Sequence, residues 1–167
     1  MKYFISAIMI LLAICKTNAQ DIFSNAKTGN VEEISKFKKE INAKNAEGYT
    51  PLILAVYHNH YTATKWLLEN GAQPDLQDQS GNTALMGATF KGYKEMISLL
   101  ISYKANMNMK NYNEATALIY AAVFSKTDII KLLLENGADK NAKDNRGNTA
   151  LKHAQMQNNE EAVKLLQ

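Results

Sequence analysis

The chain has 167 residues, of which 46% are hydrophobic and 21% charged, a composition typical of a folded domain rather than of a disordered chain. The formal net charge is only +3, and Arg146 is the single arginine. Phosphate and guanine contacts depend on clustered Lys and Arg, so this balance excludes a basic nucleic-acid-binding surface, and we expect no nucleic-acid partner.

Residues 1–19 predict a signal peptide. Lys2 precedes an apolar run, Tyr3–Ile14, and a short polar stretch then ends at the small residue Ala19. This layout is typical of a secretory signal that is cleaved after the small residue. The alternatives are a transmembrane anchor and a buried N-terminal helix, but the run spans only about 18 Å as a helix, and a hydrocarbon core is about 30 Å thick. We therefore expect a periplasmic or secreted protein with no stable membrane insertion after cleavage.

Cys15 raises the alternative of a lipid anchor. Bacterial lipoprotein signals resemble Leu-x-small-Cys, and Leu12 and Ala13 fit this pattern. Ile14, however, stands where a small residue is required, which favours cleavage without lipid. The mature chain then contains no cysteine and forms no disulfide in an oxidising compartment.

Beyond this segment the chain repeats itself every 33 residues. The copies are GYTPLILA at 48–55, GNTALMGA at 81–88, EATALIYA at 114–121 and GNTALKHA at 147–154. The recurring Thr hydroxyl can accept from free amides at a helix start, and Pro51 suits the first helical position. The recurring alanines allow close helix approach, and the leucines fill the space between layers. Each unit therefore predicts two short antiparallel helices and an extended connection.

The helices of the first complete copy are expected at 51–58 and 62–69. The second of them ends at Asn70-Gly71, because glycine readily takes the left-handed conformation that follows a helix. Connections such as 73–81 are rich in Asp, Asn and Gly and predict turns that project from the stack. A degenerate unit precedes these copies, with helices expected at 21–28 and 31–39.

These features resemble the ankyrin-repeat family. The period of 33 residues, Thr50-Pro51-Leu52 at the start of a first helix and the stretch 135–139 at the end of a second helix carry the resemblance. It implies an all-α solenoid of about five stacked helix-turn-helix units with projecting turns. The expected domain covers 20–167, with units at 21–45, 46–78, 79–111, 112–144 and 145–167.

The sequence departs from the family pattern at two kinds of position. The usual histidine after Thr-Pro-Leu is replaced in every copy, by Ile53, Met86, Ile119 and Lys152. Lys104 and Glu114 stand where other copies have glycine, and a positive φ there would cost about 1 kcal/mol each. We therefore expect modest stability, with the weakest layer at the junction of the units 79–111 and 112–144.

Sequence patterns for catalysis and metal binding are weak. His58 and His60 are two residues apart around an expected helix end, whereas helical metal ligands lie three or four apart. The acidic pairs at 32–33 and 160–161 open expected second helices, where carboxylates favour the helix dipole. The sequence has no Gly-rich phosphate loop and no nucleophile elbow. We expect no enzyme activity, metal or cofactor. The alternative is an enzyme whose catalytic acid–base pair lies on the concave face.

The resemblance implies that first helices and projecting turns line a concave surface on which partner proteins dock. The positions that vary between copies on this surface are Tyr49, Tyr57, His58, Asn82, Phe90, Lys91, Tyr112, Val123, Phe124, Asn148, Met156 and Gln157. Tyr57, Phe90, Phe124 and Met156 follow one another along the units. Such a series marks a protein-binding site if it is exposed; the alternative is that it packs as core.

The sequence thus favours an exported, monomeric, non-catalytic protein that binds another protein. Some small exported bacterial ankyrin proteins are similar to accessory factors for stress enzymes such as catalase, which implies an enzyme of this kind as a candidate partner but identifies none. The alternative is a secreted effector or an immunity protein that inhibits a target enzyme.

Overall fold

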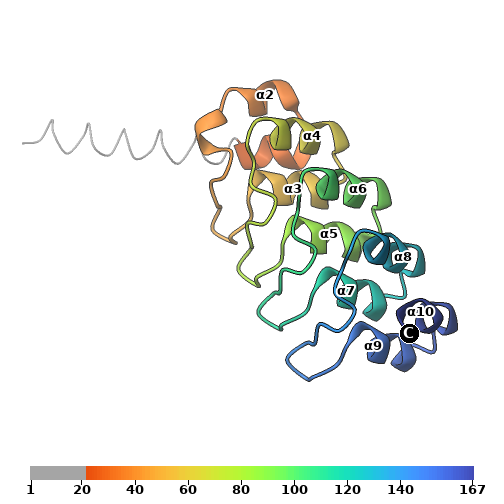
Figure 1. Cartoon of the computed structure of the whole chain (residues 1–167). Coiled ribbons are helices and arrows are strands. Elements are labelled where there is room, and N and C mark those ends of the chain that lie inside the picture. Colours follow the sequence, from red (N-terminus) through yellow and green to blue (C-terminus); the bar gives the residue numbers. More distant parts are fainter. Residues whose placement is uncertain (1–21) are drawn as a thin grey trace, which may run out of the picture. The chain divides into compact units, whose positions relative to one another are not determined.

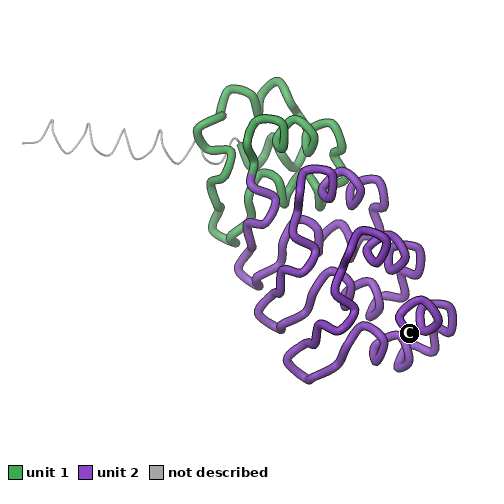
Figure 2. Tube along the Cα trace, in the orientation of Figure 1, with its two compact units in different colours: residues 1–72 green, residues 73–167 purple. Residues whose placement is uncertain are grey.

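A computed structural model describes residues 22–167. The expected signal peptide, its cleavage site and Cys15 lie outside this range. The regular elements of the described part are all helices, which confirms the all-α prediction (Figure 1). Within this part, no helix has the length and apolar character needed to cross a membrane. The chain divides into two compact units, which meet in sequence at Ala72 and Gln73 (Figure 2).

Unit 1 contains the degenerate first repeat and the first complete copy. Its helical segments are residues 22–28, α2 (Val31–Ser35), a 3-10 turn (Lys38–Glu40), α3 (Pro51–Tyr57) and α4 (Tyr61–Glu69). The helices of the complete copy agree with the expected bounds to within one residue. The helix expected at 31–39 is shorter, because the amides of Lys36 and Phe37 bond to carbonyls three residues back and tighten its last turn.

Unit 2 contains three further helix pairs. They are α5 (Ala84–Lys91) with α6 (Lys94–Ser102), α7 (Ala117–Val123) with α8 (Thr127–Glu135), and α9 (Ala150–Met156) with α10 (Glu160–Leu166). The first helix of the middle pair, α7, packs against α5 on one side and α9 on the other. Figure 1 shows the first helices of unit 2 in one layer and the second helices in another, with the connecting turns projecting beside the first layer.

The recurring threonines cap the first helices as predicted. In each copy the hydroxyl accepts a hydrogen bond from the amide three residues later, at 3.2–3.4 Å, in the pairs Thr50–Ile53, Thr83–Met86, Thr116–Ile119 and Thr149–Lys152. The residues that replace the family's histidine differ among themselves. Ile53, Met86 and Ile119 are buried, whereas Lys152 is exposed. Apolar burial therefore replaces the missing histidine contacts in three of these copies.

The recurring leucines and alanines form the core. Leu67, Leu100 and Leu133 are completely buried, and Leu166 is nearly so. The alanines at the ends of the four repeated octapeptides are also completely buried: Ala55, Ala88, Ala121 and Ala154. A methyl side chain at these positions lets neighbouring helices approach closely, and the leucines fill the remaining space.

Backbone strain occurs at the two predicted positions and at a third. Lys104 and Glu114 have φ of 64° and 59°, which confirms that both adopt the left-handed conformation. The turn between the two helices of a copy imposes the same conformation at Asn59, Gly92, Ser125 and Asn158, which are 33 residues apart. Asparagine and glycine tolerate this region well, so Ser125 is the costly member of the series.

Replacing strained residues by glycine should stabilise the protein. We expect Lys104→Gly and Ser125→Gly each to raise the free energy of unfolding by up to about 1 kcal/mol. Glu114→Gly should gain less, because Lys110 Nζ lies 2.8 Å from Glu114 Oε2 and this exposed ion pair contributes about 0–1 kcal/mol. Urea unfolding midpoints measure the effect.

The matched control is Gly137→Lys at the position equivalent to Lys104. Gly137 has a φ of 90°, and a Cβ there meets no atom within 4 Å. This variant should lower the midpoint through backbone strain alone. Lower midpoints for Lys104→Gly and Ser125→Gly would show that strain at these positions is not what limits stability.

Candidate functional site

Each projecting turn is fixed by one Asn or Asp side chain. Its Oδ1 accepts from the amides two and four residues later, at 2.8–3.1 Å. These residues are Asn45, Asp78, Asn111 and Asp144. The same residue also donates its own amide to the carbonyl four residues later. The side chain thus closes the turn from within and holds the residues at its tip in a defined position.

Neighbouring turns of unit 2 are joined to one another. The Tyr112 amide donates to the Ser80 carbonyl at 3.1 Å, and the Asn145 amide donates to the Asn113 carbonyl at 2.9 Å. Two backbone bonds therefore tie three successive turns together. A partner that contacts these turns binds a preformed surface, so the loss of conformational entropy on binding is smaller.

A side-chain network fixes the base of these turns. Asn111 Nδ2 donates to Asn82 Oδ1 at 2.9 Å and to Tyr120 Oη at 3.1 Å, and the Tyr120 hydroxyl donates to Asn82 Oδ1 at 3.0 Å. Burial raises the pKa of Tyr120; the hydrogen bond from Asn111 opposes this and the charge of Asp78 adds to it. The net pKa is raised, so the phenol stays protonated and donates. Asn82, a predicted partner contact, is thereby engaged inside the protein.

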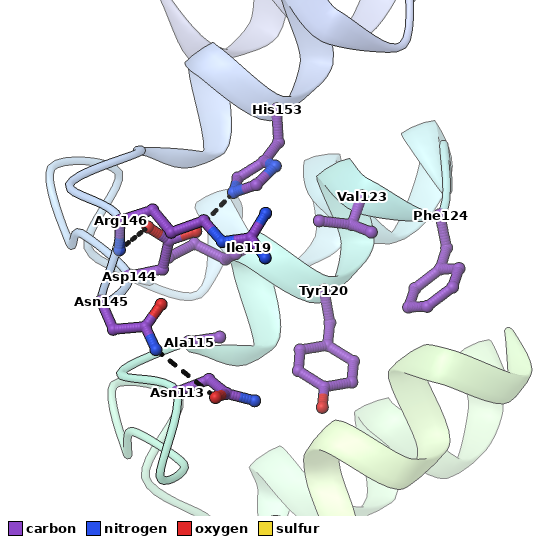
Figure 3. Close-up of a pocket in the computed structure, with 10 residues that line it drawn as sticks. All are labelled: Asn113, Ala115, Ile119, Tyr120, Val123, Phe124, Asp144, Asn145, Arg146 and His153. Carbon is purple, nitrogen blue, oxygen red and sulfur yellow. Dashed lines mark hydrogen bonds and ion pairs between the residues drawn. The ribbon is translucent and has the colours of Figure 1, made fainter.

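A cavity of about 340 Å³ lies where α7, α9 and the turns before them meet (Figure 3). One side of its lining is mainly apolar and aromatic, and the other side carries amides, an arginine and a His–Asp pair. The lining residues are Asn113, Ala115, Ile119, Tyr120, Val123, Phe124, Asp144, Asn145, Arg146 and His153. The cavity therefore offers an apolar and a polar wall to one ligand.

His153 and Asp144 form a close, mostly buried pair. His153 Nε2 lies 2.7 Å from Asp144 Oδ2, and the amides of Arg146 and Asn148 donate to Asp144 Oδ1 at 2.9 Å. Burial raises the pKa of Asp144, but the hydrogen bonds from His153, Asn148 and Arg146 outweigh it, and the net pKa is lowered. The carboxylate is therefore ionised at neutral pH and fully engaged in holding the turn.

Acid should weaken this turn. Because the pKa of Asp144 is lower in the folded than in the unfolded chain, its contribution to stability is fully present above the unfolded value of about 3.9. That contribution is lost as the pH falls through the folded pKa. We expect Asp144→Asn, which keeps the Oδ1 acceptor, to flatten the loss of unfolding free energy below about pH 4.

Urea unfolding between about pH 5 and pH 2 measures this effect. Asp78→Asn is the matched control, because Asp78 closes an equivalent turn without a histidine partner. An equal change in both variants would mean that the His153 contact does not lower the pKa of Asp144.

The predicted contact residues of unit 1 lie at the turn and at the end of α3. Tyr49 is half-buried, and its amide donates to Asn45 Oδ1 at 2.8 Å. Tyr57 and His58 are exposed at the helix end, with their rings 6.3 Å apart. His60 Nε2 lies 2.7 Å from the Lys27 carbonyl oxygen, so this ring binds the backbone. Among residues 22–167, no group of three or more His, Cys, Asp or Glu side chains could hold a metal ion.

The predicted contact residues of unit 2 lie at the helix ends and the turn tips. Phe90, Lys91, Phe124, Met156 and Gln157 are exposed and Val123 is half-buried. Tyr112 is exposed at a turn tip, while Asn148 is half-buried beside Asp144. The structure brings two of these residues together: the rings of Phe90 and Phe124 meet edge to face, with centroids 4.9 Å apart. We call the ends of α5, α7 and α9 with their preceding turns the inner face of unit 2.

Sequence reasoning missed the polar part of the cavity. Tyr120 and His153 occupy the same place in successive copies, where earlier copies have Leu54 and Gly87. This variation, next to Thr and Ala positions that recur in every copy, was the signal in the sequence that could have identified Tyr120 and His153 as site residues. The turn residue Asp144 also recurs at the repeat period with Asn45, Asp78 and Asn111.

The chain matches a family model described as ankyrin repeats (three copies). Four overlapping stretches match, residues 7–78, 22–111, 62–144 and 105–167. Together they cover more than half of the chain and include both compact units. This match agrees with the resemblance carried by the threonine caps and the repeat period.

Proposed function

Because the chain belongs to the ankyrin-repeat family, it is a protein-interaction module, and we propose that it is an exported, non-catalytic one that binds a partner protein through its first-helix ends and projecting turns. One observation supports this surface above others. Six large hydrophobic side chains are exposed among residues 22–167: Tyr57, Tyr61, Phe90, Tyr112, Phe124 and Met156. All but Tyr61 lie at the predicted contact positions. Exposed large hydrophobic side chains that recur at the predicted contact positions favour a protein-binding site.

The finer proposal concerns the partner. We propose that the protein acts as a monomer and as an accessory factor for an exported enzyme of the periplasm or of the stress response. The preformed turns suit a lasting contact with a folded partner, since little ordering is required on binding.

Site-specific photocrosslinking in the native compartment tests the binding surface. A photoreactive amino acid at Phe124 should give a covalent adduct with a distinct protein, which mass spectrometry identifies. The same group at Glu135, which is exposed at the end of α8, should give none. Adducts at Glu135 but not at Phe124 would place the binding surface on the second helices instead.

Export has its own test. We expect the mature protein, isolated from cells, to begin at Gln20 and to remain in solution without detergent, because the segment 1–19 has the layout of a cleaved signal. Intact mass spectrometry checks the N-terminus. A retained Met1 or a lipid on Cys15 would contradict cleaved export while leaving the binding proposal intact.

A further inference from the structure

One cationic side chain on the polar wall of the cavity has no ion-pair partner among residues 22–167. Arg146 lines the cavity, and Figure 3 shows its side chain extended over it. Among the residues that the structure describes, no carboxylate forms an ion pair with its guanidinium. The nearest candidate in sequence, Asp144, is already held by His153 and by two backbone amides. The guanidinium is therefore available to an external acceptor.

A second donor adjoins the same space. Asn113 Oδ1 accepts from Asn145 Nδ2 at 3.5 Å, so the Asn113 oxygen faces Asn145. Its amide nitrogen points the other way, towards Tyr120 (Figure 3). A guanidinium and an amide nitrogen both donate hydrogen bonds. Asp144 also lies on this wall, but its oxygens already accept from His153 and from two backbone amides. The donors that remain for a ligand therefore match a group that accepts hydrogen bonds and carries negative charge.

The opposite wall is apolar. Phe124 is 43% exposed and contacts Phe90, which is 39% exposed. Val123, which also lines the cavity, is half-buried. A ligand that presents only a charge would leave these side chains in water, whereas an apolar group next to the charge would cover them.

We propose that this cavity binds an acidic side chain of the partner protein, with Arg146 as its charged contact and an adjacent apolar residue of the partner against Phe124. The inference rests on the proposed function and names the chemistry of its partner. Arginine pairs with carboxylates through two parallel N–H···O bonds, so geometry as well as charge selects Asp or Glu. The expected occupant is a surface segment with an acidic residue beside a large apolar one.

Selection from a random peptide library displayed on phage, with the mature chain as bait, tests this proposal. The enriched peptides should share an Asp or Glu next to an aromatic or aliphatic residue. One such peptide and its Glu→Gln or Asp→Asn counterpart are then measured by fluorescence anisotropy. We expect the amide counterpart to bind at least tenfold more weakly, and the Arg146→Gln variant to lose a similar factor for the acidic peptide.

Two variants serve as controls. Lys143→Gln removes the same charge from an exposed residue outside the cavity lining and should change affinity less than twofold. Arg146→Lys keeps the charge but not the planar fork, and should restore only part of the affinity. Unchanged unfolding midpoints in Arg146→Gln show that the fold is intact.

Several outcomes would overturn the proposal. Acidic peptides that bind Arg146→Gln as well as the wild type would place the carboxylate elsewhere. Enriched peptides without an acidic residue, whose binding is lost in Phe124→Ala, would reject the acidic partner and leave the proposed function standing. A selection that enriches no peptide would also reject the acidic partner. The photocrosslinking experiment at Phe124 would then test the proposed function independently.

Discussion

Leu133→Ala is expected to lower the free energy of unfolding by about 2–5 kcal/mol, the usual range for removing a buried leucine side chain. Leu133 lies on α8 and is completely buried. The truncation leaves a cavity that the neighbouring layers fill only in part. Because repeats contact only their neighbours, a loss in this layer weakens its interfaces with the layers on both sides.

Phe124→Ala is the contrasting variant for this prediction. Phe124 retains 43% of its exposure, so its truncation removes only part of a phenylalanine's burial and one aromatic contact, about 1–2 kcal/mol together. Urea unfolding of both variants measures the difference between their free energies of unfolding, provided that the two m-values are equal. Equal losses would place Phe124 in the core and move the binding surface elsewhere.

The positions that depend on local structure could be predicted from the sequence. Thr50 and its equivalents cap helices through an amide only three residues away, and a repeated threonine before an apolar run reveals this. Lys104 and Glu114 were predicted to adopt positive φ because glycine occupies the same place in other copies. The positive φ of Ser125 was not predicted, because the equivalent positions hold asparagine, glycine and serine and no single residue type recurs.

The positions that depend on distant partners could not be predicted. Asn82 looked like a surface residue of a variable turn, but Asn111 and Tyr120, 29 and 38 residues later, hold its side chain. The pairing of His153 with Asp144 is equally hidden, since a separation of nine residues corresponds to no helical or strand period. Such contacts exist only once the turns have stacked against the helices.

The aromatic series is out of phase by one position at Phe124, which the repeat period shows, but the contact that results is visible only in the structure. Val123, not Phe124, is equivalent to Phe90 at the repeat period. Because α7 ends at Val123, Phe124 is the first residue beyond the helix. The two phenylalanines are offset by one position in neighbouring layers, and their rings meet edge to face, so they form one contact surface rather than two separate side chains.

The binding surface leads to the other large expected effect, on affinity for the partner protein. Phe90→Ala and Phe124→Ala should each weaken the complex by about 2 kcal/mol or more, roughly thirtyfold, as is typical of aromatic anchors in interfaces. Tyr57→Ala should have a similar effect through unit 1, where this side chain is 40% exposed at the end of α3. Isothermal titration against the partner identified by crosslinking measures each change.

Tyr61→Ala provides the matched control, because Tyr61 is 46% exposed but lies at the start of α4, outside the predicted surface. Its truncation should leave affinity unchanged within about twofold. The double variant Phe90→Ala/Phe124→Ala should lose less than the sum of the single losses, because the two rings contact each other and each truncation already disturbs the other. Strict additivity would mean that the partner contacts the two rings independently. A loss of affinity for Tyr61→Ala as large as that for Phe124→Ala would mean that exposure alone, and not position on the predicted surface, decides which aromatic side chains bind.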